Sequence, residues 1–443
     1  MKLINHVIIS KISDDLYVMI NSLNGRIDKI NNTTFKILQR WRGKENIIPF
    51  GDDELASFDY LKSHGYFVQN DTEENNKKNE LLTTLKEKHQ LSAKHITFIM
   101  GYTCNFKCAY CFESNGSSHK KAHMSIELID AAFKLIDADL ESIGLFGGEP
   151  LLPTHKNAIE YIISNAPDKT YNITTNGFYL KEYLPILNKI KISSIMVTLD
   201  GEEDVHNKRR LLTNNKSTYA KILQGITLCL TNNIPICIRM NLDETNYESC
   251  IKLKNNLLMD FKNYEHLLSF EMSPMFENQG NSRNIMLTSL YNINKNCTYD
   301  DLLKSNRFIS RFGSIINSVI LNQPLYPSYS FCDAHRDGYL VDPYGNIYPC
   351  IPSVGHEKLA IGKYFPHIEF KENSIRTRNI DKILECRNCK YSLLCGGGCP
   401  IGLDDYENVY KPECGSIKNQ IYNLMPMLYN SKSTQQAQKD CFK

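Results

Sequence analysis

The stretch TCNFKCAYCF, residues 103–112, decides how the rest of the chain is interpreted. It places three thiols within eight residues, in the pattern CxxxCxxC, with Tyr110 directly before the third thiol. At the chain's cysteine frequency of 15 in 443, roughly 0.02 chance matches are expected. Three thiolates this close together can ligate three irons of a [4Fe–4S] cube and leave the fourth iron open. A structural zinc ion would need a fourth ligand, and neither His119 nor His123 lies at the usual spacing.

The bulk composition argues against several classes of protein. Lysine and arginine number 51 against 49 aspartates and glutamates, so the net charge points neither to nucleic acid nor to an anionic membrane. No apolar run approaches the length of a membrane span, and the first residues contain no signal-peptide cleavage site. We therefore expect a cytoplasmic protein of two or three domains. In such a protein, 15 cysteines favour metal or cluster ligation over disulfides.

Residues 94–320 alternate between short apolar runs and amphipathic segments, which is typical of βαβ units and a parallel sheet. The apolar runs cover residues 96–100, 143–146, 171–175, 195–199, 235–240 and 268–272. The helical segments cover residues 125–140, 155–164, 180–191, 219–231 and 247–259. This alternation predicts an α/β fold, most simply a partial (β/α)6 barrel of the TIM type. Functional groups on such sheets collect at the carboxyl ends of the strands, and the cysteine loop follows the first strand.

Polar turn motifs follow the next strands in the same way. GGEP at 147–150 follows the second strand, TTNG at 174–177 ends the third, and TLDG at 198–201 follows the fourth. Arg239 ends the fifth strand, where its guanidinium could bind a carboxylate through two hydrogen bonds. Each motif alone predicts only a turn. Motifs at four successive strand ends, downstream of the cysteine loop, indicate one functional edge.

A second group of seven cysteines lies after residue 330. Its members are Cys332, Cys350, Cys386, Cys389, Cys395, Cys399 and Cys414. Loops as rich in glycine as CGGGC at 395–399 cannot build much hydrophobic core, and cross-linking through metal can replace that stabilisation. Two zinc ions would need eight ligands, which seven thiols do not supply, although His335 or His356 could complete one site.

Residues 1–70 predict a small separate unit. Apolar runs at 16–20 and 26–30 flank a turn and predict a β-hairpin, and two capped helices and a strand at 65–68 follow. Hairpin, helix, helix and strand form a winged-helix pattern. The unit could also be a plain N-terminal scaffold or a wing that binds nucleic acid. The absence of a cluster of basic residues argues against nucleic-acid binding. Residues 71–93 are polar and charge-rich, which predicts a linker with an exposed helix.

The CxxxCxxC loop and the strand-end motifs together resemble the radical S-adenosylmethionine (SAM) superfamily. In that family the open iron of a [4Fe–4S] cluster is chelated by the amino and carboxylate groups of SAM. The resemblance implies that Cys104, Cys108 and Cys111 hold this cluster. It implies SAM contacts from ten residues of the strand-end motifs, namely Gly147, Gly148, Glu149, Pro150, Thr174, Asn176, Asp200, His206, Arg209 and Arg239. A surface or helix-cap role explains His206 equally well.

The seven C-terminal cysteines resemble the SPASM extension of radical SAM enzymes, over residues 321–415, with a helical tail at 416–443. That extension carries two auxiliary [4Fe–4S] clusters. By this resemblance, the auxiliary I ligands are Cys332, Cys350 and Cys399, and the auxiliary II ligands are Cys386, Cys389, Cys395 and Cys414. Family members with two fully ligated clusters have an eighth cysteine, and residues 333–349 contain none. Either Asp333, Cys297 or Cys441 fills the place, or an open iron could bind a substrate thiolate.

The N-terminal pattern is similar to the recognition element of systems that modify ribosomally made peptides (RiPPs), which adds a leader peptide to its sheet edge. The combined resemblance implies a radical SAM peptide maturase of the thioether-forming sactipeptide or ranthipeptide type. It would use three [4Fe–4S] clusters and SAM to generate a 5′-deoxyadenosyl radical. Its partners would be a precursor peptide and a low-potential electron donor such as flavodoxin or ferredoxin, without nucleic acid or membrane.

Several other functions remain open at this point. An anaerobic sulfatase-type maturase that forms formylglycine usually has eight auxiliary cysteines and no leader-binding unit. A peptide cyclase that forms carbon–carbon cross-links fits the same motifs. An iron–sulfur electron carrier or a zinc-binding interaction protein would need no GGEP motif at the sheet edge. The sequence identifies no catalytic acid or base.

Overall fold

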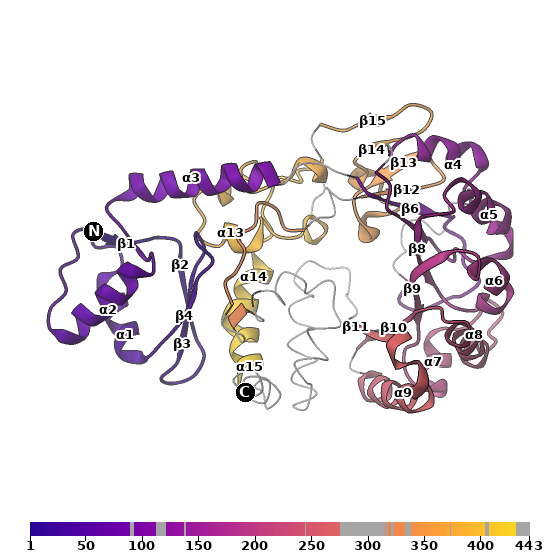
Figure 1. Cartoon of the computed structure of the whole chain (residues 1–443), viewed down its shortest axis with the longest axis horizontal. Helices are drawn as coiled ribbons and strands as arrows, with labels where there is room; N and C mark the ends of the chain where they lie inside the picture. The colour runs from indigo at the N-terminus through magenta and orange to yellow at the C-terminus, as the bar shows by residue number, and fades with distance from the viewer. Residues whose placement is uncertain are drawn as a thin grey trace. The chain divides into compact units, whose positions relative to one another are not determined.

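The computed structural model describes residues 1–88, 93–111, 121–136, 139–243, 245–274, 315, 318–319, 323–332, 338–372, 374–403 and 407–430. Their contacts divide the chain into two compact units, both drawn in Figure 1. The first unit comprises the described residues within 1–90, 278–332 and 378–443, and the second those within 91–277 and 333–377. Residues 321–415, expected as a SPASM segment, therefore contribute to both units. Within the described part of the chain, every helix is too short or too polar to cross a membrane.

The second unit is built on a parallel sheet whose strands neighbour one another in chain order from β6 to β11. These strands are β6 (His95–Ile99), β7 (Ser142–Phe146), β8 (Thr170–Thr175), β9 (Lys191–Thr198), β10 (Ile236–Leu242) and β11 (Leu268–Pro274). Each predicted apolar run forms one of them, so the α/β fold with a central parallel sheet is confirmed. Buried residues alternate along β10, where Ile236, Ile238 and Met240 are at most 1% exposed.

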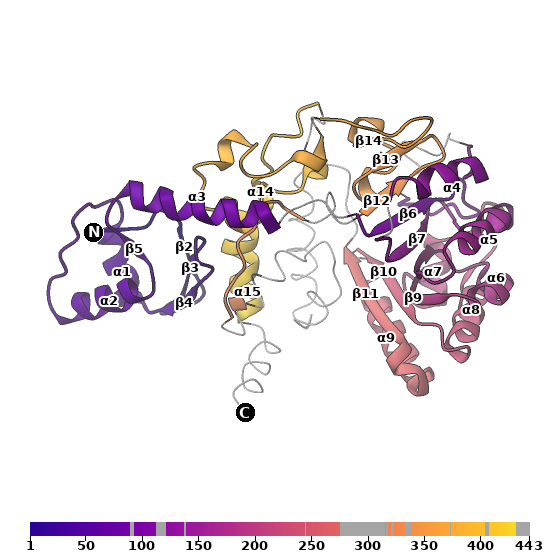
Figure 2. The ribbon, with the colours of Figure 1, turned by 45° about the horizontal axis from the view of Figure 1, so that its top comes forward.

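Helices connect these strands and lie along one side of them in Figures 1 and 2. They are α4 (Ile126–Phe133), α5 (Lys156–Asn165), α6 (Leu180–Leu187), α7 (Glu203–Arg209), α8 (Tyr219–Thr231) and α9 (Tyr247–Asp260). Helix α7 was not predicted. Helix α4 is shorter than the predicted range because its last turn tightens, and the N–H of Leu135 bonds to the carbonyl of Ala132 (3.1 Å).

Four short strands extend this sheet beyond β6, and none of them was predicted. Strand β12 (Gly338–Val341) pairs in parallel with β6, and β13 (Asn346–Tyr348), β14 (Gly362–Lys363) and β15 (Glu369–Phe370) follow in antiparallel order. The buried carboxylate of Asp342 accepts hydrogen bonds from the hydroxyl of Tyr102 (2.8 Å) and from the N–H of Asn346 (2.9 Å). The hairpin turn is thereby bonded to the chain just before the cysteine loop.

The first unit contains the expected order of hairpin, helix, helix and strand. These elements are β3 (Tyr17–Asn21), β4 (Ile27–Ile30), α1 (Asn32–Trp41), α2 (Asp52–Ser63) and β5 (Phe67–Val68). Two strands were not predicted: β2 (Val7–Lys11) completes the antiparallel sheet β2-β3-β4, and β1 (Lys2–Leu3) pairs with β5. The side chain of Asn31 caps α1 by accepting the N–H of Thr34 (2.9 Å), so the first of the two predicted helices is capped as expected.

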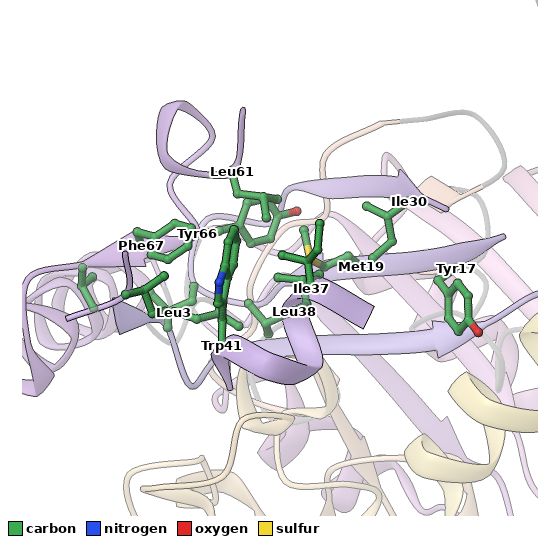
Figure 3. Close-up of a cluster of buried hydrophobic side chains, with 14 residues drawn as sticks. Leu3, Tyr17, Met19, Ile30, Ile37, Leu38, Trp41, Leu61, Tyr66 and Phe67 are labelled. Atoms are coloured by element: carbon green, nitrogen blue, oxygen red, sulfur yellow. The ribbon is translucent and has the colours of Figure 1, made fainter. Parts of the chain in front are cut away.

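Aromatic side chains fill the core between these N-terminal elements. Trp41, the chain's one tryptophan, lies in this core and is 4% exposed. Its ring centre lies 5.8 Å from that of Phe67, and Figure 3 shows both rings beside Leu3 and Tyr66.

The charge-rich segment after residue 70 forms helix α3 (Asp71–Lys88). The helix was expected, and most of its residues are exposed, but two charged residues, Glu74 and Lys78, are buried. Glu74 is 2% exposed and accepts the N–H of Asn5 (2.8 Å), and Lys78 is 7% exposed. Leucine side chains of α3 pack against a cluster that contains Ile380, Ile383 and Leu393.

The C-terminal segments of the first unit are short and helical. They comprise α13 (Ser392–Cys395), α14 (Gly415–Asn419), a π-helical turn at Gln420–Leu424 and α15 (Met425–Tyr429). Ile417, Ile421 and Met425 belong to the same buried cluster as Ile8 and Val18 of the N-terminal sheet. The two ends of the chain therefore share one hydrophobic core.

We predict that Gly25→Ala destabilises the first unit by more than the few tenths of a kcal/mol usual for a surface change. Gly25 has a φ of +74°, and an added Cβ would lie 1.7 Å from the carbonyl oxygen of Leu325. Gly43→Ala is the matched control, because Gly43 has a φ of +73° and open space around it. Urea unfolding should show a loss at least about 1 kcal/mol larger for Gly25→Ala. Equal losses would show that the Leu325 contact contributes nothing.

Candidate functional site

The three cysteines of the CxxxCxxC loop follow β6 and are of intermediate exposure. The N–H of Phe106 donates to Cys104 Sγ (3.3 Å), and the N–H of Cys111 donates to the carbonyl of Cys108 (3.3 Å). Burial raises the pKa of Cys104 to about 12 and also raises that of Cys108, whereas the cation of Arg210 lowers both. Cluster ligands are thiolates, so this cation favours the ligating form of the thiols.

The GGEP turn lies directly against this loop. The N–H of Gly148 donates to the carbonyl of Gly101 (3.0 Å), and the N–H of Glu149 donates to that of Thr103 (3.0 Å). Gly147 has a φ of +129°, and a Cβ there would lie 2.4 Å from the oxygen of Gly101. A Cβ on Gly148 would lie 2.5 Å from the oxygen of Thr103. Only glycine allows this approach, which leaves half-buried backbone groups beside the thiols.

The carboxylate of Glu149 is completely buried and joins two strand ends. Its Oε1 accepts the N–H of Leu151 (2.8 Å) and the hydroxyl of Thr175 (2.7 Å). Its Oε2 accepts the N–H of Asn176 (2.7 Å). Burial raises the pKa of Glu149, and these donors oppose that rise. The side chain therefore positions the turn, because both of its oxygens are bonded within the protein.

Asn176 links the end of β8 to the cysteine loop. Its Nδ2 donates to Asn105 Oδ1 (2.8 Å) and lies 3.7 Å from Cys104 Sγ. Thr174 is half-buried, whereas Thr175, on the opposite face of β8, is buried against Glu149. Thr175 was not among the predicted site residues. The alternation of side chains along a strand could have indicated it, because that alternation turns consecutive threonines to opposite faces of the sheet.

Tyr110 anchors the cysteine loop to the ends of β9 and β10. Its hydroxyl donates to the carboxylate of Asp200 and accepts from Arg210 Nη1 (2.6 Å) and Asn241 Nδ2 (3.2 Å). Asp200 in turn accepts the N–H of Asn241 (3.0 Å). A buried cation such as Arg210 requires a nearby anion, and Asp200 supplies one. Arg210 and Asn241 were not among the predicted site residues.

The two predicted arginines pair with carboxylates of the chain itself. Arg209 Nη1 donates to Asp243 Oδ2 (2.7 Å), and Arg239 Nη1 lies 3.7 Å from Glu271 Oε1. Both Arg209 and its neighbour Arg210 contact the cysteine loop. The carbonyl of Arg209 accepts the N–H of Ala109 (3.4 Å), and its guanidinium carbon lies 5.3 Å from the centre of the Tyr110 ring. Arg210 Nη1 donates to the hydroxyl of Tyr110 (2.6 Å).

His206 has no exposed surface. Its Nδ1 accepts the N–H of Asp200 (3.3 Å), which leaves the proton on Nε2 to be donated to the hydroxyl of Thr218 (3.1 Å). Burial lowers the pKa of His206 to about 3, so the ring is neutral near pH 7. His206 therefore supports the TLDG turn from the interior, and the surface role given as its alternative is wrong. Pro150 is also buried, and its carbonyl bonds to His155 Nδ1 (3.0 Å).

The four cysteines expected to hold auxiliary II all belong to the first unit. Cys386 is close enough to Cys395, Cys389 and Cys414 to interact electrostatically with all three. Burial, together with these neighbours, raises the pKa of Cys386 to about 12. The structure therefore brings the other three cysteines of the predicted set near Cys386.

The auxiliary I cysteines are distributed differently. Cys332 and Cys399 belong to the first unit, where both lie near Arg378, and Cys350 belongs to the second unit. The candidates for an eighth ligand, Asp333, Cys297 and Cys441, lie outside the described residues, as does His335. The described part of the chain has no group of three His, Cys, Asp or Glu side chains arranged around one metal ion. A cubane does not require that arrangement, because its thiolates bind different irons.

We expect Glu149→Gln to lower the free energy of unfolding of the second unit by about 1–3 kcal/mol, the usual cost of an unsatisfied buried polar group. The new amide would face the N–H of Asn176, so two donors would meet without an acceptor. Glu141→Gln is the control, because Glu141 is exposed and bonds only at the surface with Lys94. Chemical denaturation measures both variants. A Glu149→Gln protein as stable as the control would contradict the positioning role.

The chain resembles several known proteins in sequence and in fold. Residues 98–253 match the model of the radical SAM superfamily. A radical SAM cyclopropyl synthase of Paramaledivibacter caminithermalis, TigE, is 22% identical over 94% of this chain and 92% of its own. The cysteine-type anaerobic sulfatase-maturating enzyme of Clostridium novyi is 25% identical over 74% of this chain and 95% of its own.

A solved structure, Streptococcus suis SuiB bound to its precursor peptide SuiA, aligns over 93% of this chain and 98% of its own, with a TM-score of 0.52 and 15% identity. That likeness supports the α/β fold. Members of the matched superfamily use a [4Fe–4S] cluster and SAM. Residues 98–253 therefore form a radical SAM domain, and the chain is an enzyme.

Proposed function

We propose that the enzyme modifies a ribosomally made precursor peptide and installs a thioether cross-link between a cysteine sulfur and a carbon. The observation that carries this proposal is the pair of cysteine sets: an incomplete set of three beside the GGEP turn, and a complete set of four in the first unit. The first leaves an iron open for SAM, and the second fits an auxiliary cluster. The resemblance of the C-terminal cysteines to the SPASM extension implies auxiliary clusters, and these clusters are the feature that supports a role in peptide maturation.

The residues of the sheet edge have separable tasks in this proposal. Cys104, Cys108 and Cys111 would hold a [4Fe–4S] cluster that, with SAM bound, supplies radical chemistry. The turn at Gly147–Gly148 would offer its backbone polar groups to SAM. Glu149 holds that turn against Asn176, and Asn176 fixes the position of Cys104 through Asn105. The remaining proposed SAM contacts are Thr174, Asp200, Arg209 and Arg239. A carboxylate of the ligand would have to compete with Asp243 for Arg209 and with Glu271 for Arg239.

A thioether cross-link takes one hydrogen atom from carbon, the thiol proton and one electron from the peptide, which together are a two-electron oxidation. The hydrogen atom would pass to the 5′-deoxyadenosyl group of SAM and the proton to solvent. The remaining electron needs an acceptor, and a cluster on the auxiliary cysteine sets would take it and could return it for the next cleavage of SAM. Auxiliary I remains a proposal on Cys332, Cys350 and Cys399. Its count of three cysteines supports an iron that is open to the substrate sulfur.

The N-terminal elements support a peptide substrate. The relation to SuiB extends over 93% of the chain, whereas that to the sulfatase-maturating enzyme covers 74%. SuiB was solved with a precursor peptide, so we propose a leader-binding role for residues 1–70. Among the described strands, β4 pairs only with β3 and forms an edge of its sheet, where a leader could add as a further strand.

Formylglycine formation is the second candidate, and the match to the Clostridium novyi maturase over 95% of its length favours it. The two candidates differ in their products. A thioether lowers the mass of the peptide by two hydrogens and consumes a thiol, whereas formylglycine formation from cysteine removes the sulfur. Mass spectrometry of the treated peptide separates them.

Replacing Cys104, Cys108 and Cys111 together by alanine should abolish SAM cleavage and leave the auxiliary iron in place. Three [4Fe–4S] clusters correspond to about 12 irons per chain, and the variant should retain about 8. Iron analysis after anaerobic reconstitution, with an assay of 5′-deoxyadenosine under dithionite, measures both quantities. Cys229→Ala is the control, because Cys229 is a buried thiol within α8. A full iron count in the triple variant would contradict the assignment.

Addition of the leader peptide should slow amide hydrogen exchange in β4, whose outer edge it would cover, and leave β3 unchanged because β3 is already paired on both sides. Exchange is preferable to deleting residues 1–70, since that deletion would expose the core shared with Ile417 and Ile421. A scrambled leader is the control. Protection absent from β4, with the leader bound, would contradict edge addition.

A further inference from the structure

Helix α3 brings a buried lysine to the auxiliary II cysteines. Its side chains Leu81, Leu82 and Leu85 pack against the buried cluster that includes Cys386 and Leu393. One turn of helix before these leucines, Lys78 is 7% exposed. Figures 1 and 2 both show α3 beside the C-terminal segments of this unit. A segment that reads as a linker in the sequence is therefore part of the wall around the four thiols.

The ammonium group of Lys78 bonds to the loop that carries two of these thiols. Its Nζ donates to the carbonyl of Arg387, which lies between Cys386 and Cys389. The loop is tight, because the N–H of Cys389 bonds to the carbonyl of Cys386 (3.2 Å). A fixed donor at residue 387 restricts how the two flanking thiols can move.

A second buried cation, Arg378, lies near the same cysteines. Arg378 is 4% exposed, and among the described residues its guanidinium donates to backbone carbonyls alone. These bonds reach Val409 (2.6 Å), Gly398 (2.7 Å), Gly397 (2.7 Å) and Lys411 (2.9 Å). The carbonyls of Gly397 and Gly398 belong to the loop between Cys395 and Cys399.

Neither cation has a carboxylate partner among the described residues. No carboxylate oxygen of that part of the chain lies within 4.0 Å of Lys78 Nζ or of the Arg378 guanidinium. Asp381 is the charged group that acts most strongly on Lys78, followed by the thiol of Cys389 and by Glu74. Both carboxylates already accept hydrogen bonds from other groups, Asp381 from the hydroxyl of Tyr329 (3.0 Å) and Glu74 from the N–H of Asn5 (2.8 Å). Buried cations are costly unless an anion balances them. Cys386 is close to both cations, and four cluster thiolates outweigh the positive charge of an oxidised cube and gain one more negative charge on its reduction.

We propose that Lys78 is a positioning residue of the auxiliary II cluster, holding the Cys386–Cys389 loop and raising the reduction potential of the cluster through its positive charge. This inference rests on the proposed auxiliary cluster. It also joins the N-terminal elements to that cluster, because α3 directly follows β5 in the chain. Arg378 contributes a similar charge from the loop at Gly397 and Gly398.

The test uses full-length chain in which Cys104, Cys108 and Cys111 are alanine, so that only auxiliary clusters assemble. Lys78→Met keeps the length of the side chain and removes its charge. Lys78→Arg restores the charge, and Lys77→Met is the matched control, because Lys77 is exposed on the same helix and pairs with Glu73. Iron content and an EPR-monitored redox titration are measured for each protein.

Lys78→Met should shift the reduction equilibrium of one auxiliary cluster about tenfold toward the oxidised form, which is 59 mV for one electron. Lys78→Arg should recover most of that shift, and Lys77→Met should show none. A Lys78→Met protein with the parent's iron content and potentials would overturn the inference while leaving the cluster assignment intact. A loss of one cluster in Lys78→Met that Lys78→Arg restores would support it. If the parent bound no iron, the auxiliary clusters themselves, and this inference with them, would be wrong.

Discussion

The parallel direction of six adjacent strands is the constraint on which the radical SAM domain depends. Parallel strands finish at the same edge of a sheet, so the loops that follow β6, β7, β8 and β9 are brought together although long stretches of sequence separate them. The cysteine loop alone supplies three thiols. The later strand ends add the glycine turn, the amide of Asn176 and the carboxylate of Asp200, each bonded to that loop or to its neighbour.

Buried charge is balanced differently in the two units. In the second unit the buried cation Arg210 has Asp200 nearby through the hydroxyl of Tyr110, so the network is compensated by the chain itself. In the first unit, all the hydrogen bonds that Lys78 and Arg378 make to described residues go to backbone carbonyls. That difference fits a site whose missing negative charge comes from cluster thiolates. The protein would then adjust a cluster through residues that never touch its irons.

Much of the fold could be predicted from the sequence, because apolar runs and turn motifs are local signals. All six central strands and the N-terminal hairpin were found in that way. The short strands β12 to β15 were not, since two to four residues carry no clear period. The bond between Arg210 and Tyr110, and the burial of Lys78 in a charge-rich helix, depend on tertiary contacts that spacing does not encode.

The central claim is that the open iron of the cluster on Cys104, Cys108 and Cys111 binds SAM. Electron–nuclear double resonance on the reduced enzyme, with SAM carrying nitrogen-15 in its amino group, tests this claim most directly. We expect hyperfine coupling between the label and the cluster, and its loss when Cys104 is replaced by alanine. Fully assembled clusters that show no coupling to the labelled amine would contradict the account.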